Sequence, residues 1–65
     1  MRFEKALELL RSGEMVLCKE FKCVYRLRDD KFEFTYLKFF GNFWKETKYF
    51  SRYEILSETW EVFTQ

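Results

Sequence analysis

The stretch that decides the fold is residues 23–36, CVYRLRDDKFEFTY. Two runs of alternating apolar and polar residues flank a polar centre, Asp29-Asp30-Lys31, which is typical of a turn. Successive side chains of a strand point to opposite faces, so each run gathers its apolar residues on one face. We therefore expect an antiparallel hairpin whose buried face carries Cys23, Tyr25, Leu27, Phe32, Phe34 and Tyr36.

Upstream of the hairpin the period becomes helical. Apolar residues recur at i, i+3, i+4 and i+7, which places on one helical face Phe3, Ala6, Leu7 and Leu10. Ser12-Gly13 follows as a stop signal, because glycine adopts the left-handed conformation that ends many helices. The short apolar run over residues 15–18 then predicts a strand.

Downstream of the hairpin, residues 37–40 are expected to continue the second strand. They are apolar on both faces, which favours cover by a second layer or a subunit. Gly41-Asn42 predicts a two-residue turn into a further strand over residues 43–50. Ser51 and Glu54 fit a capping box that opens one or two helical turns. Residues 60–63, WEVF, predict a closing strand.

Together these segments predict an α+β fold. An N-terminal amphipathic helix packs on an antiparallel sheet of four to five short strands, and a short capped helix precedes the last strand. The 65 residues are expected to form a single domain, residues 1–65. A chain this short buries only about 60% of its unfolded surface. Because 23% of the residues are aromatic, we expect a homo-oligomer, a dimer or tetramer, to add stability.

Charge and hydropathy exclude several classes of protein. Twelve basic and eleven acidic residues give a net charge of +1, whereas a general polyanion binder usually has a pI above about 9. No apolar run approaches the ~20 residues that span a bilayer. No signal peptide is recognised either. We expect a cytoplasmic protein with no membrane partner.

Side chains for catalysis or metal binding are scarce. The chain has no histidine, so a conventional nucleophile–histidine pair is absent. A structural zinc site normally takes four Cys or His ligands. Cys18 and Cys23 are open to three interpretations: a redox pair, half of an inter-subunit zinc site, or two small buried hydrophobes. We expect no enzymatic activity, no metal and no cofactor.

Both ends of the chain carry stretches that resemble one protein family. Residues 3–16, FEKALELLRSGEMV, are similar to an opening signature of the type FEEALxxLKxGKxV. Residues 51–62, SRYEILSETWEV, are similar to a closing signature of the type SxxDLLAxDWEV. The chain thereby resembles the Thoeris anti-defence two-like domain family of small phage and prophage proteins. The two stretches cover 26 of the 65 residues.

The resemblance implies a compact, oligomeric α+β fold and a function in the bacterial cytoplasm of the host. Proteins of this type sequester a nucleotide-derived immune signal, a cyclic ADP-ribose isomer or a cyclic dinucleotide, without cleaving it. After the first helix the family often has an arginine and then a tryptophan, where this chain has Cys18 and Phe21. The change to cysteine removes a guanidinium suited to phosphate, whereas Phe21 keeps a face for stacking.

A nucleotide site needs aromatic faces for the base and cations for the phosphates. Each ring also suits a core or an interface, and each cation also suits a solvated strand face. Phe21 is the favoured aromatic position because of its place in the family pattern. The candidate ligand-binding residues are Phe21, Lys19, Tyr25, Arg26, Arg28, Trp44 and Lys48.

Two further functions fit the same sequence. The aromatic content and near-neutral charge also favour a protein-binding inhibitor of a bacterial immune effector, such as a CRISPR nuclease. Aromatic residues interleaved with Arg26, Arg28 and Lys38 are typical of a small single-stranded nucleic-acid binder. Binding of that kind weakens steeply with salt.

Overall fold

The central hairpin forms in the computed structural model, which describes residues 1–64. Strands β2 (Cys23–Arg28) and β3 (Lys31–Tyr36) pair antiparallel over their full length, from Cys23 opposite Tyr36 to Arg28 opposite Lys31. Asp29 and Asp30 make the turn with φ of 52° and 63°. Two successive positive φ values define the two-residue turn that matches strand twist. The turn therefore has two residues, and Lys31 belongs to β3.

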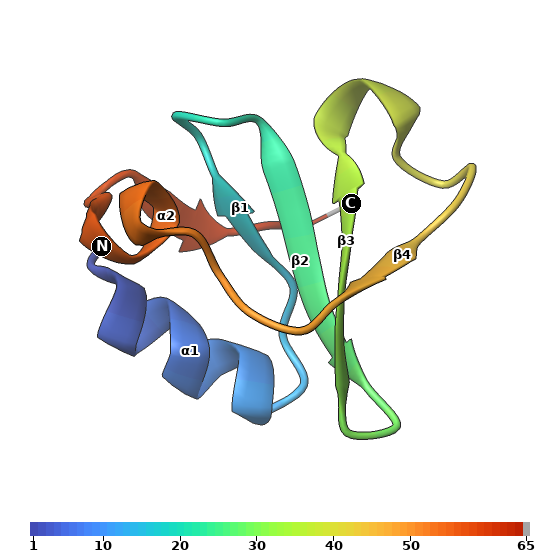
Figure 1. The fold of residues 1–65 in the computed structure, drawn as a ribbon, viewed down its shortest axis with the longest axis horizontal. Coiled ribbons are helices and arrows are strands. Elements are labelled where there is room, and N and C mark those ends of the chain that lie inside the picture. Colours follow the sequence, from blue (N-terminus) through green and yellow to red (C-terminus); the bar gives the residue numbers. More distant parts are fainter. Residues whose placement is uncertain (65) are drawn as a thin grey trace.

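Three short strands complete the antiparallel sheet. These are β1 (Val16–Cys18), β4 (Lys45–Thr47) and β5 (Trp60–Val62), and the strand order is β4-β3-β2-β1-β5. The last strand lies beside the first, with Trp60 opposite Cys18. Figure 1 shows α1 on one side of the sheet and the segment after β3 arching away from it. The expected α+β arrangement is confirmed, with five strands.

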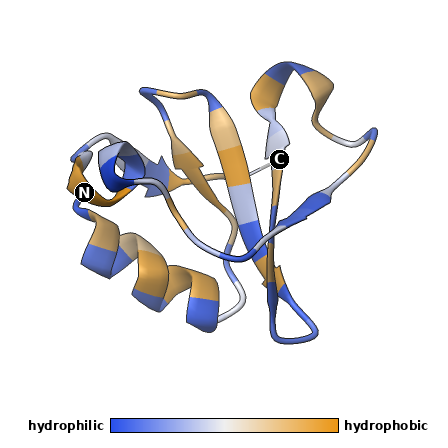
Figure 2. Cartoon of the chain, in the orientation of Figure 1, coloured by the Kyte–Doolittle hydropathy of each residue, from blue (hydrophilic) through white to orange (hydrophobic). Residues whose placement is uncertain are grey.

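The N-terminal helix, α1 (Phe3–Arg11), begins and ends where the sequence predicts. Its end is a two-bond cap. The Glu14 N–H donates to the Leu9 carbonyl at 2.9 Å, and the Gly13 N–H donates to the Leu10 carbonyl at 3.1 Å. This bond pair requires a left-handed residue, and Gly13 supplies it with a φ of 97°. Figure 2 shows hydrophobic and hydrophilic bands alternating along α1, as its amphipathic pattern predicts.

The main core lies between α1 and one face of the sheet. Residues directly opposite one another in paired strands share a face, and this face is apolar from β5 to β3. The buried residues of this core, from α1 and from the sheet, are Ala6, Leu10, Val16, Cys18, Cys23, Tyr25 and Trp60. Partly buried side chains packed around them are Phe3, Leu9, Leu27, Phe32, Phe34 and Phe50.

The predicted capping box opens α2 (Arg52–Leu56). The Ser51 N–H donates to Glu54 Oε1 at 2.8 Å, and the Glu54 N–H donates to Ser51 Oγ at 3.2 Å. The indole of Trp60 donates to the Glu54 carbonyl at 2.9 Å, which ties α2 to the core. Hydrogen bonds therefore hold the side chain, the N–H and the carbonyl of Glu54.

The segment between β3 and α2 differs from the prediction. Residues 37–40 do not continue β3; Leu37–Phe39 form a 3₁₀ helix, η1. The strand expected over residues 43–50 is reduced to β4 (Lys45–Thr47), which pairs with β3 as an antiparallel neighbour. Gly41 and Asn42 lie within the long connection between these two strands, over residues 37–44, and do not form the expected two-residue turn. Phe40 explains the change, because its ring packs 4.9 Å from that of Phe63 and 5.8 Å from that of Trp44. A continuous strand cannot turn back in this way.

These rings cover the sheet face opposite α1. Leu17, Val24 and Thr35 are buried on that face, which also carries Arg26. The Arg26 guanidinium lies 4.0 Å from the centre of the Trp44 ring, so the rings packed with Trp44 lie over this face. The segment thus supplies cover for the sheet, but its own Leu37 and Phe39 are exposed. No second layer among residues 1–64 buries these two side chains, and their cover by a subunit stays a prediction. Among residues 1–64, the longest helix has nine residues, and none meets the length and hydropathy that a membrane crossing requires.

Candidate functional site

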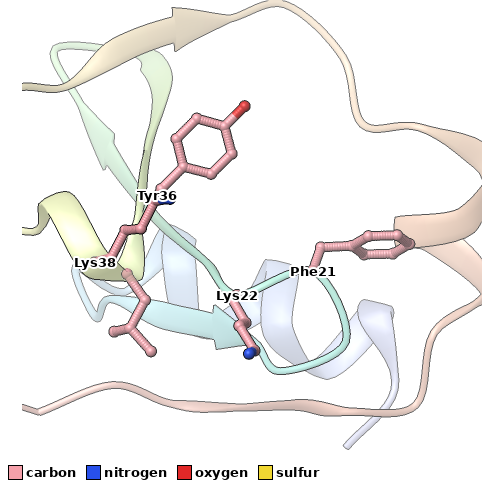
Figure 3. Close-up of a pocket in the computed structure, with 5 residues that line it drawn as sticks. Phe21, Lys22, Tyr36 and Lys38 are labelled. Atoms are coloured by element: carbon pink, nitrogen blue, oxygen red, sulfur yellow. The ribbon is translucent and has the colours of Figure 1, made fainter.

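A hollow of about 500 Å³ opens where the β1–β2 turn meets the end of β3. We call it the Phe21–Tyr36 pocket. Figure 3 shows the rings of Phe21 and Tyr36 at the two sides of the view, with Lys22 between them. Its lining residues are Phe21, Lys22, Tyr36, Leu37 and Lys38.

Backbone hydrogen bonds bring the two halves of this pocket together. The Phe21 N–H donates to the Cys18 carbonyl at 3.3 Å, which closes the β1–β2 turn. Lys22 then adopts a φ of 55°, in the left-handed region, and its carbonyl accepts the Leu37 N–H at 2.8 Å. Because Cys23 pairs with Tyr36 in the adjoining register, this bond extends the ladder by one step. The turn and the start of η1 are therefore held at a fixed separation.

Aromatic rings form a series that leads from the core to the surface at this pocket. The ring of Tyr36 lies 5.8 Å from that of Phe34 and 6.4 Å from that of Phe39, and Phe39 lies 6.1 Å from Phe43. Tyr36 is 46% exposed and Phe21 is 39% exposed. Burying large rings contributes much of the stability of most domains, so exposed rings around a hollow indicate a binding surface.

The charge at the pocket is positive. Lys22 and Lys38 are exposed and contribute the only charges of its lining among residues 1–64. The ammonium of Lys38 lies 5.1 Å from the centre of the Phe39 ring. Within residues 1–64, neither lysine has a carboxylate oxygen within 4.0 Å, whereas Lys5, Lys19 and Arg26 do. Both ammonium groups are therefore available to an anionic ligand.

A second hollow, of about 330 Å³, adjoins the first. Phe21 and Tyr36 line both, so these two rings form the boundary between them. We call it the Glu54 pocket, because the capping box of α2 supplies its polar groups. Its lining residues are Phe21, Cys23, Tyr25, Phe34, Tyr36, Thr47, Ser51 and Glu54.

The thiol of Cys23 faces this second pocket in its protonated form. Burial raises its pKa from 9.0 to about 11, and electrostatic interactions with Glu54 and with Cys18 add to the effect. The nucleophile and metal ligand is the thiolate, which is scarce at neutral pH when the pKa is this high. Cys18 and Cys23 are directly opposed in β1 and β2, and both are buried and free. Their surroundings favour the interpretation as small buried hydrophobes.

The seven candidate residues from the sequence do not form one site. Phe21 lines both pockets, and Tyr25 lines the Glu54 pocket from a buried position in the core. Arg26 and Trp44 stack on the opposite face of the sheet, where Arg26 Nε also donates to Glu33 Oε1 at 2.7 Å.

The remaining three candidates are exposed cations that line neither pocket. Lys19 pairs with Glu61 at 3.9 Å, Arg28 ends β2 beside the hairpin turn, and Lys48 follows β4. The structure thus brings together two pairs, Phe21 with Tyr25 and Arg26 with Trp44. Of these two pairs, Phe21 and Tyr25 line the Glu54 pocket.

Sequence reasoning missed most of the Phe21–Tyr36 pocket. It placed Tyr36 on the buried face of the hairpin, named Lys38 only for nucleic-acid binding, and did not single out Lys22. A signal was present, because an aromatic residue precedes a lysine in both Phe21-Lys22 and Tyr36-Leu37-Lys38. The hairpin register, with Cys23 opposite Tyr36, brings these two short motifs together.

In comparisons with known proteins, no family model, curated protein or solved structure matches this chain. The resemblance of its two ends to the Thoeris anti-defence two-like family therefore stays a prediction.

Proposed function

We propose that this protein binds a nucleotide-derived immune signal, such as a cyclic ADP-ribose isomer or a cyclic dinucleotide, and sequesters it without cleaving it. The observation that carries the proposal is the Phe21–Tyr36 pocket, where two exposed rings and two lysines surround one hollow. Within residues 1–64, neither lysine pairs with a carboxylate. The two terminal signatures supply the class of ligand and the setting, a phage protein acting in a bacterial cytoplasm.

The size and chemistry of the pocket support this choice. Its volume of about 500 Å³ falls within the range of about 300–1,000 Å³ found for small-molecule sites. Stacking on an aromatic side chain contributes about 1–3 kcal/mol per base. Lysine ammonium groups bind phosphate as mobile point charges. A base on Phe21 or Tyr36 would place its phosphates within reach of Lys22 and Lys38.

Binding without turnover is supported by the lining of the same pocket. Its described residues include no histidine, carboxylate or thiol. Cleavage of a phosphoester or glycosidic bond usually needs a general acid or base, or a metal that activates water. The nearest thiol and carboxylate, those of Cys23 and Glu54, lie in the adjoining pocket. There Cys23 has its pKa raised to about 11, so its thiol is a poor nucleophile at neutral pH.

The test is native mass spectrometry of protein purified from bacteria with an active nucleotide-signalling defence. We expect retained mass equal to whole cyclic nucleotides, and the mass of the assembly also reports the expected homo-oligomer. Calorimetry with cyclic ADP-ribose isomers and cyclic dinucleotides then measures the affinity. The proposal would be overturned if the purified protein retained no nucleotide mass and none of these ligands gave heat on binding.

Variants locate the site. Phe21→Ala removes one stacking face and should weaken binding about tenfold or more. The double change Lys22→Ala with Lys38→Ala should weaken binding further and flatten its salt dependence. Lys31→Ala is the matched control, because Lys31 is an exposed lysine beside the hairpin turn, at the far end of β3. It should leave the affinity unchanged.

A second candidate function is direct inhibition of a bacterial immune protein. A separate observation favours it: Tyr53 and Leu56 on α2 are 68% and 73% exposed, and Tyr49 and Ile55 beside them are also exposed. The two functions separate in a phage infection assay on bacteria that carry the defence. If Leu56→Glu no longer protects the phage from the defence while Phe21→Ala still protects it fully, the target is a protein. If Phe21→Ala loses this protection while Leu56→Glu keeps it, the target is the nucleotide.

A further inference from the structure

We infer that the Glu54 pocket binds the hydroxyl groups of a ribose, so that the combined site selects ribonucleotides over their deoxy counterparts. This inference rests on the proposed nucleotide binding and names the part of the ligand that the second pocket recognises. It is carried by the polar groups of the α2 capping box, which line a hollow that shares two rings with the first pocket.

The two pockets adjoin at Phe21 and Tyr36, which line both of them. A base held against either ring therefore brings its ribose to the place where the two pockets meet. The ribose joins the base to the 5′-phosphate, and its 2′- and 3′-hydroxyls lie on its other edge. A ribose at this place can therefore direct its phosphate toward one hollow and its hydroxyls toward the other. Their volumes, about 500 and about 330 Å³, allow this.

The two linings have opposite electrostatic character. The first contains Lys22 and Lys38 and no carboxylate, whereas the second contains Glu54 and no cation, among the described residues. A carboxylate repels phosphate, and removing the water between like charges makes this repulsion stronger. The phosphates therefore belong on the lysine side, and a neutral donor group belongs on the Glu54 side.

Glu54 retains acceptor capacity after its structural role is met. Its Oε1 accepts the Ser51 N–H at 2.8 Å, and an ionised carboxylate has two oxygens and about four acceptor positions. Ser51 Oγ accepts the Glu54 N–H, which leaves its own proton free to donate. Thr47 Oγ1 donates to the Tyr49 carbonyl at 2.8 Å and keeps its lone pairs. Sugar hydroxyls, which both donate and accept, match this set.

The carboxylate also has a defined position. The capping box holds its side chain, and the bond from the Trp60 indole to the Glu54 carbonyl holds its backbone. The negative charge of Glu54 contributes to the raised pKa of Cys23, so the carboxylate acts on the interior of this pocket. A preorganised acceptor loses little conformational entropy when a ligand binds.

The experiment compares matched ligands by calorimetry on the full chain. The probes are cyclic di-AMP against its 2′-deoxy analogue, and ADP against 2′,3′-dideoxy-ADP. A hydrogen bond to a charged acceptor is worth about 1.5–3 kcal/mol, so the ribose form should bind about tenfold to a hundredfold more tightly. Glu54→Gln should reduce this preference to about twofold. Glutamine also completes a capping box, so α2 is preserved, as thermal unfolding will verify.

Glu46→Gln is the matched control, because Glu46 lies on β4 outside both linings. It should leave the ribose preference intact. Equal affinity for ribose and deoxy ligands would overturn the inference and leave the proposed function standing. A ribose preference that survives Glu54→Gln would also overturn it. If no probe binds and the protein retains no nucleotide in native mass spectrometry, both the inference and the proposed function are wrong.

Discussion

The two faces of the sheet are both buried, but they are covered by different kinds of structure. On one face, α1 packs on Tyr25 and Trp60 with the regular spacing of a helix. On the other, Val24 and Thr35 are covered by rings from an irregular segment, among them Phe40 and Trp44. The first cover is a regular helix that its own residues encode locally, although it packs on distant residues such as Trp60. The second depends on contacts between distant residues, so the two faces should differ in stability.

The largest effect is expected on the helix-covered face. Trp60 is 1% exposed, and its ring lies 5.4 Å from that of Tyr25 and 5.7 Å from that of Phe3. Trp60→Ala should lower the free energy of unfolding by about 3–5 kcal/mol. Domains are stable by only about 0.05–0.15 kcal/mol per residue, so much of the variant should be unfolded in buffer. Circular dichroism and urea denaturation measure this.

Trp60→Phe serves as the control, because it keeps a ring and removes the indole donor to the Glu54 carbonyl. It should cost about 1–2 kcal/mol. A loss below 1 kcal/mol for Trp60→Ala would show that this face does not dominate the stability.

A smaller effect is expected on the opposite face. Trp44 is only half-buried and contacts Arg26 and Phe40. Trp44→Ala should lower the free energy of unfolding by about 1–2 kcal/mol, partly through the lost cation–π contact of about 0.5–1 kcal/mol. Hydrogen exchange should quicken at the amides of Val24 and Thr35 while α1 stays protected. If Trp44→Ala costs as much as Trp60→Ala, the proposed difference between the faces is wrong.

The same difference explains which parts of the fold could be predicted from the sequence. The helix ending at Gly13, the hairpin and the capping box at Ser51 depend on residues close in sequence, and all three were predicted. Residues 37–40 and 43–50 were assigned to two strands joined by a turn at Gly41-Asn42. Their path is set instead by the contact of Phe40 with Phe63, which no local pattern contains.

The candidate pocket shows a similar limit. Phe21 was named from the sequence, but Lys22 and Tyr36 join it only through the hairpin register and the left-handed backbone of Lys22. Neither is encoded by periodicity. Arg26 was assigned to a ligand because it is a cation on a strand. Its half-buried pairing with Glu33 requires knowledge of which residue lies opposite, and that depends on a turn of two residues rather than three.

A third change tests how well the irregular cover excludes water. Thr35 is fully buried beneath it, and its hydroxyl has no hydrogen-bond partner among the described residues. A buried unpaired hydroxyl is destabilising. Thr35→Val should therefore raise the free energy of unfolding by about 1 kcal/mol, measured by urea denaturation.

Thr47→Val is the matched comparison, since the Thr47 hydroxyl donates to the Tyr49 carbonyl at 2.8 Å. It should lower the stability by about 0.5–1 kcal/mol. Destabilisation by Thr35→Val would mean that water reaches and satisfies this hydroxyl, and that the irregular cover is open.

The last effect vanishes at neutral pH and concerns the end of the helix-covered face, where the core meets the Glu54 pocket. Burial holds the pKa of Cys23 at about 11 in the folded protein, against 9.0 ordinarily. Below pH 9 the thiol is protonated in both the folded and the unfolded chain, so its titration does not change the stability. Between about pH 9 and about pH 11 the unfolded chain loses a proton that the folded chain retains. The free energy of unfolding should therefore fall across this range.

Other groups titrate in the same range, so the measurement is a difference between two proteins. Urea denaturation of the unchanged chain and of Cys23→Ala, from pH 7 to pH 11, isolates the contribution of this thiol. The stability difference should be constant to about pH 9 and then shift against the unchanged chain. A constant difference over the whole range would mean that water reaches Cys23 through the Glu54 pocket. The helical cover would then not exclude water from the sheet beside that pocket, and at this end of the sheet the two faces would not differ in how well they exclude water.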